Sequence, residues 1–242
     1  MSKVRLDQLV VERGLAGSRE KAKALILAGQ VFVDGQKSDK AGREVSEDAR
    51  VEVLAQPKYV GRGGLKLEAA LAWWSIGVAG KVAIDVGSST GGFTDCLLQH
   101  GATRVYAFDV GTNQMDWRLR NDPRVVLREG FNARFLQPSD VPEPVDLMVG
   151  DVSFISMTLI LPPAVALLHD HGELAILVKP QFEVGRGQVG KGGIVRDPQL
   201  HQEAVARVSG AVQALGFVTD VMESPILGAE GNREFLLYGR RQ

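Results

Sequence analysis

Cysteine is nearly absent from this chain of 242 residues, in which Cys96 is the single example. One cysteine excludes an internal disulfide framework and any cysteine-rich zinc site, and it is typical of proteins that work in a reducing compartment. The first residues, from Met1 to Asp7, contain no apolar signal segment. We therefore expect no export and a cytoplasmic location.

Long apolar runs and a large excess of one charge are also missing. A membrane-spanning helix needs about 18 to 20 successive apolar residues, and the nearest candidate, Met157 to Leu168, is interrupted by Pro162 and Pro163. We expect no stable membrane association. The net charge of -1 does not indicate a nucleic-acid binder, but the first 66 residues carry +4 and the remainder about -5. A basic N-terminal part on an acidic body favours an anionic partner for that part.

The N-terminal part has the pattern of a small α+β unit. Apolar spacing predicts two short helices within residues 7–28, and Ser18 is placed to cap the second one. Short alternating runs at residues 31–33 and 50–54 predict strands, and Asp34-Gly35 is a hairpin turn signal.

A change of composition near residue 57 predicts a domain boundary. Residues 58–64 are basic and rich in glycine, and a helical pattern resumes at Leu65. The length suits two domains. We predict a first domain over residues 1–58, a linker over 59–64 and a second domain over 65–242.

The second part alternates short apolar runs with helical segments. This alternation predicts βαβ units and a mostly parallel, doubly wound α/β sheet. The expected strands are Val82–Val86, Arg104–Phe108, Val125–Leu127, Asp146–Val149, Leu174–Val178, Phe217–Val221 and Glu234–Tyr238. The last two have no helix between them and should pair as an antiparallel hairpin. Residues 183–197 contain five glycines and are expected to form a mobile loop beside the cleft.

The strongest local signal is a glycine-rich turn between an apolar strand and a helix expected from Thr94. Such a turn lies where doubly wound sheets bind nucleotides, although it could be purely structural. Its spacing differs from the dinucleotide motif G-x-G-x-x-G, because Ser89 replaces the second glycine. Asp85 before the turn suits the ammonium and sulfonium charges of S-adenosylmethionine better than a pyrophosphate. The residues expected at this cofactor are Asp85, Gly87, Ser88, Ser89, Thr90, Gly91, Gly92 and Phe93.

Three charged residues follow other strands of the predicted sheet. Asp109 ends the second strand, where an acid can accept hydrogen bonds from ribose hydroxyls. Asp151 and Lys179 end the fourth and fifth strands, so a carboxylate and a lysine should lie near each other and near the ligand. A carboxylate that orients a lysine suits proton transfer.

Other charged or reactive residues have simpler explanations from pattern alone. Lys66 fits an exposed helix position and Glu234 a charge at the start of a strand. His169 and His171 lack partner ligands at matching spacing and are expected in a loop at a helix end, so we predict no metal site. Cys96 is expected to be a buried structural thiol.

Taken together, these motifs resemble the TlyA (hemolysin A) family of ribosomal RNA 2'-O-methyltransferases, and the resemblance covers essentially the whole chain. Three segments are similar to the S4-type RNA-binding domain: Arg5 to Val10, Gly14 to Ala22 and Gly29 to Gly35. The remainder is similar to the FtsJ-like methyltransferase domain, a Rossmann-like class I fold.

This resemblance implies methyl transfer from S-adenosylmethionine to a ribose 2'-hydroxyl of ribosomal RNA. It implies a catalytic tetrad at Lys66, Asp151, Lys179 and Glu234. Asp151 is also expected near the cofactor, and Asn132 stands where many FtsJ-like enzymes contact adenine with an aspartate. The residues expected to bind RNA are Arg5, Ser18, Arg19, Lys21, Lys23 and Arg62. The expected partners are ribosomal RNA or ribosomal subunits; the modified nucleotide and the oligomeric state stay open.

Three alternatives remain at this stage. The chain could be a non-catalytic RNA-binding factor for ribosome assembly, or a cytolysin, as the older family name suggests. A pseudouridine synthase can also carry an S4-type domain, but that activity leaves the glycine-rich turn unexplained.

Overall fold

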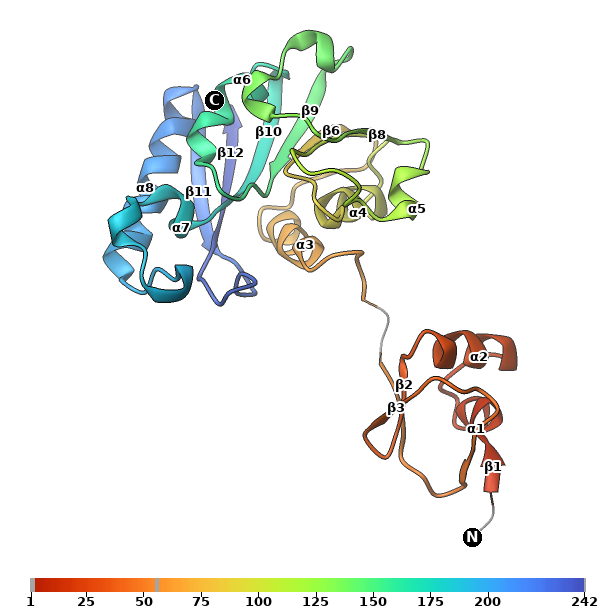
Figure 1. Ribbon diagram of the computed structural model, residues 1–242. Coiled ribbons are helices and arrows are strands. Elements are labelled where there is room, and N and C mark those ends of the chain that lie inside the picture. The colour runs from red at the N-terminus through yellow and green to blue at the C-terminus, as the bar shows by residue number, and fades with distance from the viewer. Residues whose placement is uncertain (1–2, 55–56, 242) are drawn as a thin grey trace. The chain divides into compact units, whose positions relative to one another are not determined.

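The chain forms two compact units, Met1–Pro57 and Lys58–Gln242. The computed structural model describes residues 3–54 and 57–241, and Figure 1 shows its helices and strands. Residues 58–64 belong to the larger unit instead of forming the linker that we expected over 59–64. The physical reason is Tyr59, whose ring is 3% exposed and packs in the same hydrophobic core as Leu67 and Phe93.

The smaller unit is an α+β fold. Its elements are β1 (Lys3–Arg5), α1 (Leu6–Glu12), α2 (Arg19–Leu27), β2 (Val31–Val33), β3 (Gln36–Ser38), β4 (Glu44–Ser46) and β5 (Val51–Val53). β2 pairs antiparallel with both β3 and β5, and β1 pairs antiparallel with β4. The hairpin predicted at Asp34-Gly35 is confirmed: both residues have positive φ, 50° and 77°, as a tight two-residue hairpin turn requires.

The apolar spacing of the two predicted helices is confirmed by the core of this unit. Leu6, Leu9 and Val10 of α1 meet Ala22 and Ile26 of α2 in one hydrophobic cluster with the strands. Ser18 caps α2 as predicted, because its hydroxyl accepts a hydrogen bond from the backbone N–H of Lys21 at 3.2 Å. β1, β3 and β4 were not predicted, since each contains at most one apolar residue.

The larger unit contains a seven-stranded sheet in the order β11-β12-β10-β9-β6-β7-β8. The strands are β6 (Val82–Val86), β7 (Arg104–Phe108), β8 (Val125–Arg128), β9 (Val145–Gly150), β10 (Leu168–Val178), β11 (Phe217–Glu223) and β12 (Phe235–Arg241). β6 to β10 run parallel to their neighbours within that group, and β12 is antiparallel to both β10 and β11. The predicted doubly wound sheet and its terminal hairpin are therefore confirmed.

Helices cover both faces of this sheet (Figure 1). They are α3 (Gly63–Trp73), α4 (Gly92–Gln99), α5 (Trp117–Arg120), α6 (Leu161–Val165), α7 (Pro180–Glu183) and α8 (Pro198–Ala214). Successive side chains of a strand point to opposite faces, so Ala83 packs in the core with α3 and α4, whereas Ile84 packs in the core with α6 and α8.

One local prediction was wrong. His169 lies near the start of β10, not in a loop at a helix end, and its Nε2 lies 2.9 Å from the Asp146 carboxylate. Among residues 3–54 and 57–241, no group of three His, Cys, Asp or Glu side chains could hold a metal ion. In the same part of the chain, no helix is long and apolar enough to cross a membrane.

Candidate active site

Two cavities lie at the carboxyl ends of the central strands. The larger one, about 550 Å³, is lined by Gly87, Ser89, Asp109, Asn132 and Asp151 among others. The smaller one, about 170 Å³, shares Gly87, Ser89 and Asp151 and adds Ser88, Thr90, Gly92, Phe93 and Lys179. The structure thus brings nearly all of the residues predicted at the cofactor to one edge of the sheet. Asp85 and Gly91 lie outside both linings.

The glycine-rich turn between β6 and α4 depends on its glycines for space and conformation. Gly87 has φ of 81°, and a Cβ on it would lie 2.5 Å from the backbone oxygen of Asp151. Gly91 caps α4 in the left-handed region, with φ of 95°, a conformation that suits glycine. α4 begins at Gly92, two residues before the predicted start. The turn therefore packs directly against the end of β9.

Asp85, in β6, contacts the first turn of α4, which follows the glycine-rich turn. Its carboxylate is fully buried and accepts a hydrogen bond from the Thr94 hydroxyl at 2.6 Å. Burial raises the pKa of Asp85 to about 7. We expected Asp85 to meet a ligand's positive charge. The structure buries its carboxylate and leaves the Oδ1 atom without a hydrogen-bond partner among the described residues, so a contact between Asp85 and the cofactor stays a prediction.

Asp109 is held in place by the backbone. One carboxylate oxygen accepts from the N–H of Ser89 and the other from the N–H of Gly111, both at 2.7 Å. Each carboxylate oxygen has a second lone pair, so Asp109 can still accept hydrogen bonds from a ligand in the larger cavity. Asn132 also lines this cavity, where its Oδ1 accepts from the N–H of Arg134 at 3.1 Å. The amide nitrogen of Asn132 is the donor left for a ligand.

Asp151 and Lys179 form the ion pair predicted from adjacent strand ends. The Lys179 Nζ lies 2.5 Å from the Asp151 Oδ1 and donates to the Ser153 Oγ at 2.9 Å. β9 and β10 are neighbouring parallel strands, with Ile176 opposite Gly150, so both strands end at the same edge of the sheet. Lys179 and Asp151 both line the smaller cavity.

Lys66 and Glu234 form a second ion pair, which pattern alone did not reveal. The Lys66 Nζ donates to the Glu234 Oε2 at 2.5 Å, and the two residues are 7% and 3% exposed. Gly63, one turn before Lys66 in α3, lines the smaller cavity, and a Cβ on it would lie 3.7 Å from the Asp151 carboxylate. The interpretation of Lys66 as an exposed helix residue was wrong, because α3 packs against the sheet beside β12.

The segment before β12 is anchored by residues that sequence reasoning missed. Asn232 is 1% exposed; its Oδ1 accepts from the N–H of Val195 and its Nδ2 donates to the carbonyl of Gly193. Asn232 therefore attaches the glycine-rich residues 183–197 to the segment that carries Glu234. The only sequence signal is the polar run Gly231-Asn232-Arg233, which gives no indication of these contacts.

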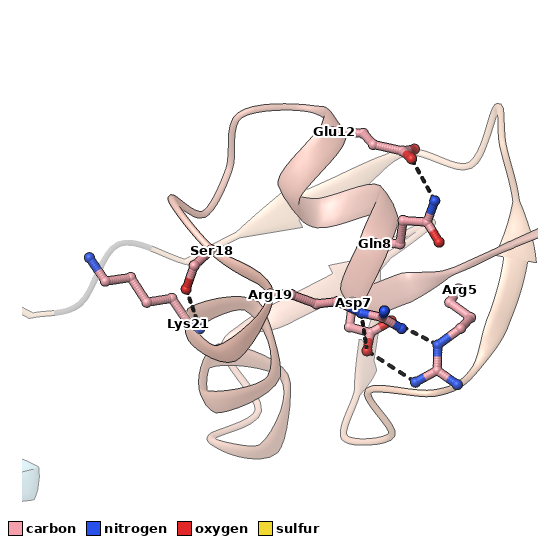
Figure 2. Close-up of polar contacts among 7 residues, drawn as sticks. All are labelled: Arg5, Asp7, Gln8, Glu12, Ser18, Arg19 and Lys21. Atoms are coloured by element: carbon pink, nitrogen blue, oxygen red, sulfur yellow. Dashed lines mark hydrogen bonds and ion pairs between the residues drawn. The ribbon is translucent and has the colours of Figure 1, made fainter.

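The smaller unit holds most of the residues expected to bind RNA (Figure 2). Arg5 and Arg19 both hydrogen-bond the buried carboxylate of Asp7, and about half of each arginine side chain is exposed. The hydrogen bond from Arg5 lowers the pKa of Asp7 to about 2. Lys21 and Lys23 are exposed on α2. Two guanidinium groups are thus held at one carboxylate while part of each stays accessible.

Two other residues expected at RNA are engaged within the protein. The Ser18 hydroxyl is the N-cap of α2. Arg62, in the larger unit, is exposed but donates to the backbone carbonyl of Leu227 at 2.8 Å. The Ser18 hydroxyl therefore stabilises the start of α2. The Arg62 guanidinium binds the segment before β12.

Comparison with known proteins agrees with this architecture. Residues 59–241 match the FtsJ-like methyltransferase family, and residues 4–51 match the S4 domain. The chain is 46% identical over 243 residues to the 16S/23S rRNA (cytidine-2'-O)-methyltransferase TlyA of Mycobacterium tuberculosis, covering 99% of this chain and 91% of that protein. It is 44% identical over 237 residues to Hemolysin A of Brachyspira hyodysenteriae, covering 97% and 99% of the two chains.

A solved structure is similar over the whole chain. A protein named for a hemolysin, from Streptococcus thermophilus, is 44% identical with a TM-score of 0.74, and the match covers 100% of this chain and 90% of that one. The methyltransferase match over residues 59–241 favours methyl transfer over the pseudouridine synthase alternative. The chain belongs to the FtsJ-like methyltransferase family, among the TlyA (hemolysin A) proteins in which an S4 domain precedes the methyltransferase domain.

Proposed function

We propose that this protein transfers a methyl group from S-adenosylmethionine to the 2'-hydroxyl of a cytidine in ribosomal RNA. The observation that carries this proposal is Lys179, held by Asp151 and Ser153 beside the glycine-rich turn. The tuberculosis relative is named for cytidine 2'-O-methylation of 16S and 23S rRNA, which supports this choice of acceptor.

The larger cavity suits S-adenosylmethionine. Its volume of about 550 Å³ lies within the range of roughly 300–1,000 Å³ common for ligand pockets. Asp109 offers acceptors for the ribose hydroxyls, Phe108 and Phe131 offer apolar surface for adenine, and the Asn132 amide offers a donor. When bound, the cofactor supplies an electrophilic methyl group on its sulfonium.

The side chains at the smaller cavity suit attack by a hydroxyl. The ribose oxygen forms a bond to the methyl carbon while the carbon–sulfur bond breaks and its electron pair goes to sulfur. Lys179 takes up or polarises the hydroxyl proton at Nζ, and Asp151 holds that nitrogen in place. Lys66 and Glu234 form the second ion pair of the proposed tetrad; neither lines the smaller cavity, but Gly63, one turn before Lys66, does. Close placement of reacting groups supplies much of the rate in such a site.

The smaller unit supplies affinity for RNA in this proposal. Arg5, Arg19, Lys21 and Lys23 present cationic groups on or beside its two helices, and contacts between such groups and phosphates dominate nucleic-acid affinity. The expected partner is therefore ribosomal RNA, free or within a ribosomal subunit. Arg62 would add a contact from the larger unit.

A direct experiment tests this function. The purified protein is incubated with ribosomal subunits and S-adenosylmethionine labelled at the methyl carbon, and 2'-O-methylated positions are mapped by resistance of the RNA to alkaline cleavage. We expect label at the 2'-oxygen of one or a few cytidines. Label on a base would contradict the ribose assignment. RNA binding without any methyl transfer would support the non-catalytic assembly factor instead.

A further inference from the structure

Glu183 is a buried carboxylate that the proposed chemistry does not use. It ends α7, four residues after Lys179, and its side chain is 3% exposed. One carboxylate oxygen accepts from the Ser156 hydroxyl at 2.6 Å, and the other accepts from the backbone N–H of Met157 at 2.7 Å. Burial raises the pKa of Glu183 above its ordinary value.

Glu183 forms no ion pair among the side chains that the structure describes. Arg207 donates to the backbone carbonyl of Glu183, not to its carboxylate, and the positive charge of Arg207 offsets only part of the rise in the pKa of this carboxyl. Burying a carboxylate without a cation is costly. Two donors converge on the side chain, however, and a carboxylate presents two acceptor oxygens where an amide presents one. The contacts therefore specify a carboxylate at a position where stability alone favours a neutral side chain.

The two segments joined by Glu183 are those that carry the Asp151–Lys179 pair. Residues 151–157 follow β9, and residues 179–183 follow the neighbouring strand β10. The segments meet at Lys179 with Asp151 and Ser153, and again at Glu183 with Ser156 and Met157. α7 is a single rigid turn between the two contacts, beginning at Pro180. Two attachment points at opposite ends of one helical turn restrict how far one segment can shift or turn against the other.

We propose that Glu183 is a positioning residue for methyl transfer, which sets the placement of Lys179 against Asp151 by fastening α7 to the segment after β9. The inference rests on the proposed function, because the placement matters only if Lys179 acts on the ribose hydroxyl. Glu183 itself touches neither substrate nor cofactor in this proposal. Its contribution is geometric, and misplacement of a reacting group by about 1 Å can cost on the order of 100-fold in rate.

A control carboxylate, Glu173, lies in the middle of β10, the strand that precedes Lys179 and α7. Glu173 in β10 accepts hydrogen bonds from Lys81 and Tyr238, so Glu173→Ala also removes two side-chain hydrogen bonds. It does so far along β10 from Lys179 and outside both cavity linings. A purely structural effect should appear in both variants, whereas a positioning effect should appear only at Glu183.

The experiment compares single-turnover methylation of ribosomal subunits by the wild-type chain, Glu183→Ala, Glu183→Gln and Glu173→Ala. We expect Glu183→Ala to lower the rate constant by roughly 10- to 100-fold while the affinity for S-adenosylmethionine, measured by calorimetry, stays near wild type. Glu183→Gln keeps one acceptor oxygen and should recover part of the rate. Glu173→Ala should retain the wild-type rate.

A second measurement does not depend on methylation. The ¹⁵N resonance of the Lys179 Nζ should shift in Glu183→Ala and in Ser156→Ala, but not in Glu173→Ala. Ser156→Ala removes one of the two donors to Glu183, together with the hydrogen bond that the Thr158 N–H donates to Ser156. Equal rates for Glu183→Ala and wild type, or equal losses in Glu183→Ala and Glu173→Ala, would overturn the proposal. If Glu183→Ala does not fold, Glu183→Gln and Ser156→Ala decide by the same criteria. A wild-type chain that methylates no ribose contradicts the function itself, and the Lys179 resonance then still tests the positioning role.

Discussion

Lys66 and Glu234 are 168 positions apart in the sequence, yet their charged groups meet at 2.5 Å in the interior of the larger unit. Both side chains are almost fully buried. If one partner were removed, water could not solvate the charge of the other. Lys66 comes from α3, at the start of the unit, and Glu234 directly precedes β12, near its end. This pair therefore connects the first helix of the unit to its last strand.

Removing one partner of this pair should destabilise the fold. We expect Glu234→Ala to lower the free energy of unfolding by about 3–5 kcal/mol, because it leaves the Lys66 ammonium buried and unpaired. Urea denaturation followed by circular dichroism measures this change. The control is Glu223→Ala, which breaks the half-exposed pair between Glu223 and Arg233 and should cost less than about 1 kcal/mol. Equal costs for the two variants would contradict the burial argument.

The two lysines of the site should act as one unit in catalysis. We expect Lys179→Ala to lower the methyl-transfer rate by about 10²–10⁴-fold, the range for losing an acid–base group. Lys66→Ala and Asp151→Ala should be comparably damaging, and the double variant Lys66→Ala with Lys179→Ala should be scarcely worse than Lys179→Ala alone. Single-turnover kinetics provide the measurement. Multiplicative losses would show that the lysines act independently, and a near-normal rate for Lys179→Ala would remove the mechanism.

Asp109 should carry part of the affinity for S-adenosylmethionine. Because its carboxylate is fixed by Ser89 and Gly111, we expect Asp109→Ala to weaken binding by about 1–3 kcal/mol, the cost of leaving buried polar groups unpaired. Calorimetric titration with S-adenosylmethionine checks this value. Asp122→Ala, which removes an acid bonded to Arg124 and outside both cavity linings, should bind as the wild type does.

The larger unit should bind the cofactor without the smaller one. A chain that begins at Lys58 retains Tyr59 and the core around it, so we expect it to fold and to bind S-adenosylmethionine with near wild-type affinity. It should lose methylation of ribosomal RNA, because the S4 domain is absent. A chain that begins at Arg62 lacks the buried Tyr59 ring and should be measurably less stable. Full methylation by the Lys58 chain would refute this division of labour.

Acid should loosen the smaller unit through Asp7. The hydrogen bonds from Arg5 and Arg19 lower the folded-state pKa of Asp7 to about 2, below that of the unfolded chain. The resulting stabilisation is therefore fully present above about pH 4 and is lost as the pH falls through about 2. Since both arginines are half exposed, we expect it to be only about 1–2 kcal/mol.

The test compares the stability of the smaller unit in the wild type and in Asp7→Asn. Urea denaturation, followed by the amide NMR signals of this unit, measures that stability at several pH values from 6 to 2. The stability difference between the wild type and this variant should shrink as the pH falls. A difference that stays constant over this range would show that ionisation of Asp7 contributes nothing.

Local sequence patterns were sufficient to predict most of the helices, strands and turns of the fold. The strands at residues 82–86 and 104–108 were predicted with the bounds that the structure has, because a short apolar run between turn residues suits a strand buried on both faces. The turn at Asp34-Gly35 and the cap at Ser18 were predictable for a similar reason. Each depends on the conformational preference of one or two residues and not on distant contacts.

Local sequence patterns predicted only some of the contacts in the candidate site. Asp151 and Lys179 could be placed together because parallel strands end at one edge of a sheet. Glu183 could not be assigned a partner, since its hydrogen bonds to Ser156 and Met157 depend on how two irregular segments leave that edge. Asn232 was missed because its partners are backbone atoms, which carry no sequence signal.

The sequence by itself determined the order of the elements, the parallel sheet and the position of its glycine-rich turn, because these depend on local propensity and on alternation of apolar residues. Only the tertiary structure decided that the Asp85 carboxylate is fully buried and that Lys66 lies inside the protein opposite Glu234. The reason is that burial of a charged side chain depends on which distant segment packs over it. For Lys66, that distant segment is the one that leads into β12, which inserts between β10 and β11.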